Sequence, residues 1–322
     1  MFAFLGVEVK TDDETGEVTL LQKGLINKVI KAVGLEDATP KHTPAEATPL
    51  GTNADGKASE EKWSYLSIIG MLLYLASNSR PDIQFAVHQC ARFTHAPKQS
   101  HTNAVKRIVR YLLSTKDKGM TFKPDKEMRL DCYVDADFAG LWRHEDDQDP
   151  VCVKSRSGFV MTLGNCPFIW ASKLQTEIAL STLEAEYIAL SNSMREVIPM
   201  RRLLEEIGEK LNLSFCKPTM IHSKVFEYNN GALGLATSPK MTPRTKYIGV
   251  KYHWFKDKVG EDKGILLEKI ESENQKADIF TKGLTIDKFR KNQRPSHGMV
   301  IPIIVRKRGR VTIWTFTRIM VR

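Results

Sequence analysis

The segment Leu130-Asp131-Cys132-Tyr133-Val134-Asp135 is rich in apolar and aromatic residues, which is typical of a strand in a sheet. Asp135 stands at the end of this strand, and Asp137 falls on the same face because side chains alternate along a strand. Two more strands are expected at residues 157–163 and 166–171. We therefore expect a sheet with acidic side chains at one of its edges.

The strongest helix signal of the sequence follows these strands. Ser181 and Glu184 form a capping-box pattern at its start, and Gly208 is expected to end it. Farther along, the pattern predicts a strand, a helix, a strand and a closing helix, at residues 219–226, 229–236, 264–270 and 274–283. Three strands followed by alternating helices and strands predict a mixed α/β fold, with helices packed on a sheet.

The residues before about 126 predict a separate, mainly helical unit. Its strands are expected at residues 4–9 and 18–21, an exposed loop at 36–59, and helices at 59–77, from 81 onward and at 102–113. The last of these helices carries Lys106, Arg107 and Arg110 on one face. Such a face either follows a phosphate backbone or is simply solvated.

The charge of the chain is concentrated at one end. Its 322 residues allow one large or two ordinary domains, and 42% hydrophobic with 27% charged residues argues against wholesale disorder. The net charge is +10, and ten Lys and Arg residues with no acidic residue lie between Lys288 and Arg322. The excess therefore belongs to the tail, and the overall charge does not indicate what the body of the protein binds.

Cysteine usage and hydropathy place expectations on the cellular compartment. The five cysteines are odd in number and widely spaced, without a Cys-x-x-Cys pair, which favours a reduced, intracellular protein without structural zinc. No apolar run approaches the roughly 20 residues that a spanning helix needs. We expect neither membrane insertion nor secretion.

Acidic residues in apolar surroundings are the remaining candidates for chemistry. The sequence has no glycine-rich dinucleotide loop, phosphate loop, nucleophile elbow or His-Glu-x-x-His zinc motif. Asp135 ends a strand, Glu186 lies at the edge of the packing face of its helix, and Asp278 lies near the start of the closing helix. Buried acids are costly unless they are paired, protonated or bound to a cation. Together the three would form an oxygen-lined Mg²⁺ site, whereas each taken singly also fits a surface acid.

Several segments resemble copia-type retrotransposon polyproteins. Residues 133–140 (YVDADFAG), 180–190 (LSTLEAEYIAL) and 277–284 (ADIFTKGL) resemble the ribonuclease H domain of that family. Earlier segments resemble the end of its reverse transcriptase and the following connection, at residues 4–9, 65–74, 79–83 and 107–113. The resemblance covers roughly residues 1–292, in the same order as in the family.

The resemblance implies cleavage of the RNA strand of RNA–DNA hybrids with two Mg²⁺ ions, or Mn²⁺ in their place, held by four carboxylates. Asp135, Glu186 and Asp278 match three of the four positions. At the fourth, the family has Asp-Asn and this sequence has Tyr228-Asn229. The candidate contacts to nucleic acid are Asn229 and the basic helix face of Lys106, Arg107 and Arg110.

The tyrosine at position 228 predicts an impaired nuclease. Phenols, with a reference pKa near 10, are neutral at pH 7 and poor Mg²⁺ ligands. Glu227 is adjacent, but successive strand residues point to opposite faces, so its participation would need a bulge. Tyr247 also replaces a usual histidine, and Pro199 interrupts the helix that bears Glu186. The alternatives are a non-catalytic remnant that binds nucleic acid and a decayed reading frame without a selected role.

The resemblance divides the chain into three parts. Residues 1–125 correspond to the end of a reverse transcriptase, residues 126–292 to a ribonuclease H-like domain, and residues 293–322 to a basic tail without a counterpart in the family. The paired aspartates of the polymerase would precede Met1, so we expect no reverse transcriptase activity from this chain alone. The implied partners are an RNA–DNA hybrid and the other Pol polyprotein segments. The implied location is the cytoplasm, in virus-like particles where the parent element is active, with the nucleus as an alternative.

Overall fold

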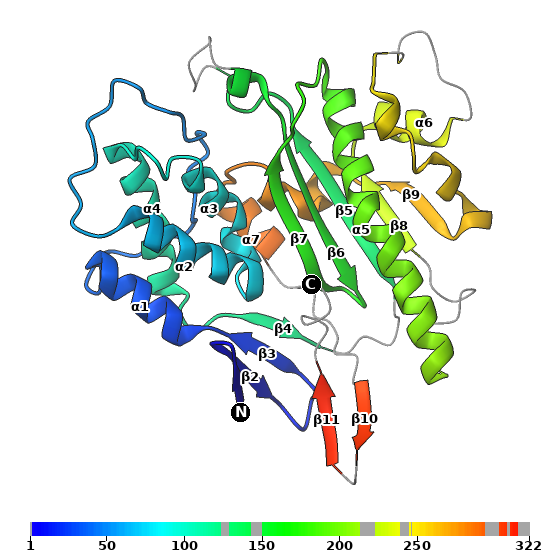
Figure 1. Ribbon diagram of the computed structural model, residues 1–322, viewed down its shortest axis with the longest axis horizontal. Helices are drawn as coiled ribbons and strands as arrows, with labels where there is room; N and C mark the ends of the chain where they lie inside the picture. Colours follow the sequence, from blue (N-terminus) through cyan, green and yellow to red (C-terminus); the bar gives the residue numbers. More distant parts are fainter. Residues whose placement is uncertain are drawn as a thin grey trace.

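The structure is a computed structural model of the chain, and it describes residues 2–123, 129–142, 150–212, 223–238, 245, 247–293, 303–307 and 310–314. Figure 1 shows that its two larger sheets belong to the N-terminal and C-terminal parts of the chain. A separate two-stranded pairing joins β10 (Ile303–Lys307) to β11 (Arg310–Trp314) in the basic tail. The predicted mixed α/β class is confirmed.

The N-terminal sheet has four antiparallel strands in the order β1-β2-β3-β4, at Phe2–Phe4, Val7–Thr11, Val18–Leu21 and Met120–Phe122. The prediction of one strand over residues 4–9 is wrong. The chain turns at Leu5 and Gly6, both with positive φ, and pairs β1 with β2. Glycine adopts this backbone without steric cost, which permits the tight turn. The unit therefore contains a sheet as well as the expected helices.

Four helices accompany this sheet, α1 (Lys23–Val33), α2 (Tyr65–Asn78), α3 (Gln84–Ala91) and α4 (Gln99–Ser114). Helix α2 begins at residue 65 rather than near residue 59, because the Ser64 hydroxyl accepts a 3.3 Å hydrogen bond from the Ser67 backbone N–H. Helix α1 was not predicted, although its buried residues have helical spacing, at positions 26, 29, 30 and 33.

The C-terminal sheet has five strands in the order β7-β6-β5-β8-β9. Their bounds in chain order are β5 Leu130–Asp137, β6 Arg156–Leu163, β7 Cys166–Leu174, β8 Ser223–Glu227 and β9 Ile265–Lys269. The first three strands are antiparallel, whereas β8 runs parallel to both β5 and β9. Parallel neighbours need crossover connections, which contain α5 (Thr182–Leu211) and α6 (Asn230–Thr237). Strand β5 is therefore central, and Asp135 lies near its carboxyl end.

Helix α5 starts as predicted and runs farther than predicted. The Ser181 hydroxyl accepts a 3.2 Å hydrogen bond from the Glu184 backbone N–H, which caps the first turn. The helix continues through Pro199 to residue 211, so the expected interruption is wrong. Val197, Ile198 and Met200 around the proline are buried, and their packing offsets the hydrogen bond that proline cannot make.

The closing helix predicted over residues 274–283 is also wrong. The chain forms a 3₁₀ turn, η9 (Lys276–Phe280), and then helix α7 (Ile286–Gln293). All four residues from Ala277 to Phe280 are buried. A surface helix would turn at least one of them toward solvent, so this short segment lies between packed layers.

Both faces of the five-stranded sheet pack against other elements. Leu130, Cys132 and Val134 belong to a core that includes residues of α5. Tyr133 and Val160 belong to a second core, which includes residues of α1, α2, α3 and α4. The N-terminal helices lie beside the sheet in Figure 1. The two units therefore share a core, and none of the helices in the described ranges is long and apolar enough to cross a membrane.

Candidate functional site

Buried acidic side chains gather near the end of β5. Asp135 comes from β5, Glu186 from α5, Glu227 from the end of β8 and Asp278 from η9. All four are buried, with exposed fractions of 4%, 4%, 0% and 2%. The three acids singled out in the sequence thus lie inside the protein. A fourth acid, Glu227, lies with them, although strand alternation had predicted that it would face the other way.

Two of these acids share a lysine. The Lys282 Nζ lies 2.8 Å from an Asp278 oxygen and 3.3 Å from an Asp135 oxygen. The Thr281 hydroxyl donates a hydrogen bond to Asp135, and the Lys288 Nζ lies 2.5 Å from the second Asp278 oxygen. Because one ammonium contacts both carboxylates, Asp135 and Asp278 are close neighbours, and their charges are largely compensated by protein cations.

The other two acids have fewer partners. The Glu227 Oε1 accepts a 2.9 Å hydrogen bond from the Asn229 backbone N–H. The Glu227 Oε2 and the Glu186 Oε2 are buried and have no hydrogen-bond partner among the described residues. Buried polar atoms without partners carry a desolvation cost of about 1–3 kcal/mol each. These two oxygens are the part of the cluster that the protein leaves unsatisfied.

Burial raises the pKa values of Asp135, Glu186 and Glu227. It raises the pKa of Asp135 to about 6, with Lys282 opposing and Asp278 adding to the increase. It raises the pKa of Glu227 to about 8, and the charge on Asp135 adds to this increase. The pKa of Glu186 lies well above its usual value because of burial and then because of the charges on Glu227 and Asp135. Glu186, Glu227 and Asp135 therefore interact as one electrostatic group.

We expect the metal-free protein to lose stability between pH 6.5 and pH 8. Glu186 and Glu227 bind protons in the folded chain at pH values where the unfolded chain has released them, so their contribution falls as the pH rises. His88, whose pKa burial lowers to about 4, acts in the opposite direction only below about pH 6.5. The unfolding free energy should fall by about 2 kcal/mol across this window.

Urea denaturation with a chelator at a series of pH values measures this dependence. The Glu227→Gln variant is the control, because an amide does not titrate and the fall should be smaller. Equal slopes in the two proteins would contradict the assignment of the effect to residue 227.

The structure buries residue 227 and exposes residue 228. Ser223, Val225 and Glu227 form the buried face of β8, and the side chain of Tyr228 is 48% exposed. The pairing of β5 with β8 runs from Leu130 opposite Ser223 to Tyr133 opposite Phe226 without a register shift. Adjacent residues do point in opposite directions, as expected, but the inward one is Glu227. Its burial therefore needs no bulge.

The donor set suits a hard divalent cation. Mg²⁺ prefers carboxylate oxygens, and it usually keeps several waters and takes one or two protein carboxylates together with substrate phosphates. The unpartnered oxygens of Glu186 and Glu227 match that preference. As the side chains stand, no three His, Cys, Asp or Glu residues within the described ranges are grouped closely enough to hold a metal ion. The chemistry of the residues fits such an ion, with water and substrate completing its coordination.

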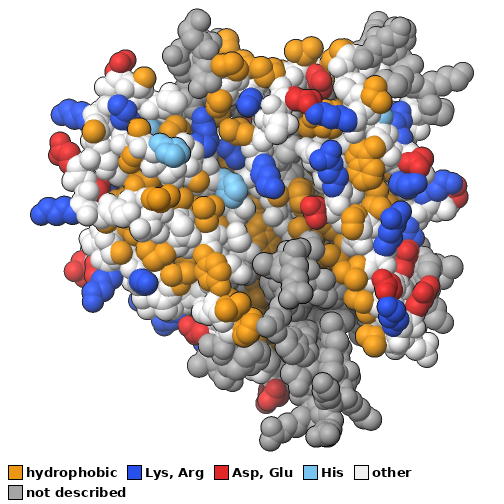
Figure 2. Space-filling model, in the orientation of Figure 1, with side chains coloured by type: hydrophobic (Ala, Val, Ile, Leu, Met, Phe, Trp, Pro, Cys, Tyr) orange, Lys and Arg blue, Asp and Glu red, His pale blue; other side chains and the backbone are white. Residues whose placement is uncertain are grey.

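Two basic side chains of α4 pair with acids of the segment between α1 and α2. The Lys106 Nζ lies 2.5 Å from Glu61, and an Arg107 nitrogen lies 2.8 Å from Glu46. Arg110 belongs to the same helix, and the side chain of Asn229 caps α6 by accepting hydrogen bonds from two backbone N–H groups. On the face shown in Figure 2, Lys and Arg side chains are spread over both units and mixed with apolar ones. Three of the four residues expected to contact nucleic acid, Lys106, Arg107 and Asn229, thus have partners within the protein.

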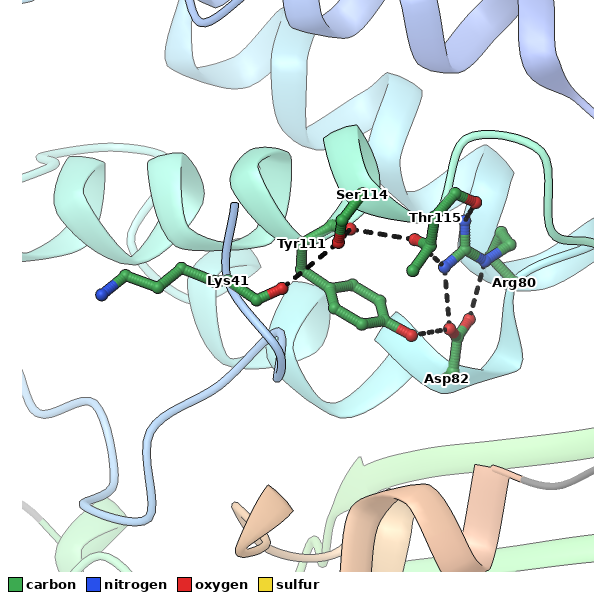
Figure 3. A network of polar contacts seen from close by, with 6 residues as sticks. All are labelled: Lys41, Arg80, Asp82, Tyr111, Ser114 and Thr115. Atoms are coloured by element: carbon green, nitrogen blue, oxygen red, sulfur yellow. Dashed lines mark hydrogen bonds and ion pairs between the residues drawn. The ribbon is translucent and has the colours of Figure 1, made fainter. Parts of the chain in front are cut away.

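A cavity between the two units has none of the four cluster acids in its lining. It has a volume of about 820 Å³ and is lined by residues of both units, including Arg80, Thr162 and Phe280. On one wall, the guanidinium of Arg80 binds both Asp82 oxygens, at 2.9 and 2.8 Å, and the Tyr111 hydroxyl also donates to Asp82 (Figure 3). Arg80 further donates to Thr115. The Ser-Arg-Pro-Asp segment therefore has a structural role, holding the end of α4 against η1 (Pro81–Ile83).

We expect Asp82→Asn to destabilise the protein by about 3 kcal/mol, because it leaves a buried guanidinium without its counter-ion. Arg80 and Asp82 are 2% and 9% exposed, so solvent screens this pair little. Urea denaturation measures the loss. Asp117→Asn is the matched control, because Asp117 also lines the cavity but pairs with Lys23 in solvent. It should cost less than about 1 kcal/mol, and an equal loss in both variants would contradict the prediction.

Comparison with known proteins gives long matches to one group. No protein-family model matches the sequence. The retrovirus-related Pol polyprotein from transposon RE1 of Arabidopsis thaliana is 33% identical over 286 residues, which are 89% of this chain and 18% of that protein. The Pol polyprotein from transposon RE2 of the same plant is 31% identical over 299 residues, 93% of this chain and 19% of that protein. The Pol polyprotein from transposon TNT 1-94 of Nicotiana tabacum is 32% identical over 294 residues, 88% and 20% respectively. The chain spans about a fifth of the length of these relatives.

Proposed function

Because this chain belongs to the retrovirus-related Pol polyproteins of copia-type transposons, we propose that residues 126–292 are a ribonuclease H-like domain that cleaves the RNA strand of RNA–DNA hybrids. The observation that carries the proposal is the burial of Asp135, Glu186 and Asp278, from three separate elements, near the end of the central strand. Such acids are costly unless a cation or a proton compensates them. A surface role for any of the three does not fit this burial.

The order of the strands supports the same proposal. An antiparallel group of three strands followed by two parallel strands brings the ends of β5 and β8 together, next to the first turns of α5. Each acidic residue therefore stands on an element whose position is fixed by packing rather than on a long loop. Rigid support of this kind is what a metal-dependent nuclease requires, since misplaced ligands lose most of the rate.

The chain's own residues would bind and orient the reacting groups. We assign Asp135, Glu186 and Asp278 as ligands of Mg²⁺, or of Mn²⁺ in its place. When bound, such ions supply an activated hydroxide and stabilise the leaving 3′-oxygen. Burial of these carboxylates excludes bulk water from them, and Lys282 holds Asp135 and Asp278 together.

We assign an impaired activity to this copy. Tyr228 occupies the position of the fourth carboxylate, and its side chain is half exposed beside the cluster rather than part of it. A neutral phenol does not replace the missing charge at a divalent cation. The ancestral activity is therefore a hybrid ribonuclease, and the present activity depends on what compensates at position 228.

Residues 1–125 resemble the end of a reverse transcriptase, and we assign them a supporting role. They contribute α1 to α4 to the core shared with the sheet. The remaining Pol segments of the parent element would be the partners of this part, in cytoplasmic particles or in the nucleus. The same shared core means that activity is best tested on the full chain rather than on residues 126–292 alone.

The test is cleavage of an RNA–DNA hybrid by the full chain in Mg²⁺, with separate labels on the two strands. Products from the RNA strand of the hybrid, with an RNA duplex and a DNA duplex left intact, support the proposal. Absence of cleavage by the wild type and by a variant with aspartate at position 228, both folded, overturns it. Salt-dependent hybrid binding without cleavage would instead favour the non-catalytic remnant.

A further inference from the structure

We infer that Glu227 takes over the cation-binding role lost at position 228, forming with Glu186 the carboxylate pair that binds Mg²⁺ in this chain. The inference rests on the proposed function, which it deepens by naming a ligand that the family pattern does not contain. Glu227 stands one residue before the expected position and on the opposite side of its strand.

The position of Glu227 is set by the sheet. Strand β8 lies between β5 and β9 in parallel register, and Phe226 is opposite Tyr133 of β5. The next residue, Glu227, therefore reaches the level of Val134 and Asp135. Its side chain is fully buried, in line with Val225 on the same face, whereas Tyr228 points outward. A carboxylate enters the cluster from β8 even though the expected one is missing.

Glu227 has the unsatisfied oxygen that a ligand should have. Its Oε1 is occupied by the Asn229 backbone N–H, and its Oε2 has no partner among the described residues. Glu186 likewise leaves its Oε2 without a partner. Two buried carboxylates from different elements, each with one unpartnered oxygen, are stable together only when a cation or a shared proton lies between them.

The remaining acids of the cluster already have lysines beside them. Lys282 contacts both Asp135 and Asp278, and Lys288 contacts Asp278. Glu186 and Glu227 have no ion pair with a lysine or arginine in the described part of the chain. An added positive charge is therefore most favourable beside this pair, and Mg²⁺ is commonly bound by only two carboxylates together with water and substrate phosphate.

With Glu227 in place of a ligand at position 228, the chain is expected to bind the cation but to cleave its substrate poorly. A ligand from residue 227 approaches from the interior of the sheet, whereas one from residue 228 would approach from the exposed side. Glu227 would hold the cation from the interior side, without the ligand that the family pattern has at position 228. Rates depend steeply on how the reacting groups are placed, and misplacement by about 1 Å costs about 100-fold. Retained Mg²⁺ binding with weak cleavage is the expected combination.

The experiment is a titration of the metal-free full chain with Mn²⁺, followed by electron paramagnetic resonance of the free ion, and competition by Mg²⁺. We expect the wild type to bind and Glu227→Gln to lose affinity by about tenfold or more, while Tyr228→Phe retains it. Glu268→Gln is the matched control, because Glu268 lies on the adjacent strand β9 and pairs with Lys224 at 2.6 Å. It should bind as the wild type does.

Unchanged affinity in Glu227→Gln, or no binding by the wild type, overturns the inference and favours a proton shared by Glu186 and Glu227. Thermal melting with a chelator shows whether each variant is folded, and Glu227→Asp is the second variant should the glutamine variant fail to fold. Because binding is measured without substrate, the inference and the proposed function fail separately. If the protein binds the cation through Glu227 but no variant cleaves the hybrid, the inference is supported and the proposed nuclease function is refuted.

Discussion

Restoring aspartate at position 228 should raise Mg²⁺-dependent cleavage of the RNA strand about 100-fold over the wild type. The change replaces a half-exposed phenol with a carboxylate beside the buried acids, and it supplies the ligand that the family pattern has there. A charged group placed at a reacting centre commonly contributes about 10²–10³-fold. Single-turnover cleavage of the labelled hybrid at saturating protein measures the chemical step and leaves differences in hybrid binding out.

The matched control for this gain is Tyr74→Asp. Tyr74 is also partly exposed, at 40%, but it lies on α2 in the other unit. It adds the same charge to the protein without adding a ligand, so the rate should not rise. If Tyr74→Asp raised cleavage as much as Tyr228→Asp, the gain would reflect net charge and not the site. If wild type and Tyr228→Asp cleaved equally fast, Glu227 would serve as a full replacement and impairment would be refuted.

Glu227 and residue 228 can be separated by combining their substitutions. In the wild-type background, Glu227→Gln removes the carboxylate to which we assign the residual activity. In the Tyr228→Asp background the same change should matter less, because the aspartate introduced at position 228 supplies a ligand of its own. Non-additive effects of this kind are expected when two residues act on one ion.

The sequence predicted the central part of the fold because local signals and packing agree there. The Ser181 cap and the apolar stripe after it specified α5, and the apolar pattern of residues 130–135 specified β5. Predictions failed where a few residues decide the conformation. The positive φ of Leu5 and Gly6 divides one expected strand into two. The η9 segment is buried on all sides, so a periodicity argument has no exposed face to detect.

The sequence indicated three acidic residues of the site, but not the side chains that surround them. Asp135, Glu186 and Asp278 stood out because acids are rare in apolar segments. Alternation along β8 correctly separated residues 227 and 228, but alternation alone does not say which of two neighbours faces the core. The buried residues Ser223 and Val225 carried that information. The ion pair of Lys282 with Asp278 has an (i, i+4) spacing, which is visible in the sequence.

Replacing Asp135 with asparagine in the Tyr228→Asp background should abolish cleavage, with a loss of at least about 1000-fold. Asp135 lies at the end of the central strand and interacts with both halves of the cluster, through Lys282 with Asp278 and through its charge with Glu186 and Glu227. An asparagine keeps the shape but removes the negative charge that a divalent cation requires.

Asp131→Asn is the matched control. Asp131 is buried on the same strand, and burial raises its pKa, but it lies at the opposite end of the strand. The Asp131→Asn variant should retain cleavage. The Asp135→Asn variant should melt at a temperature no lower than that of its parent at pH 8 with a chelator, because the substitution removes a buried charge. A folded Asp135→Asn variant that still cleaves the hybrid would show that the chemistry lies elsewhere in the protein, and a loss shared by Asp131→Asn would assign it to the strand rather than to the carboxylate.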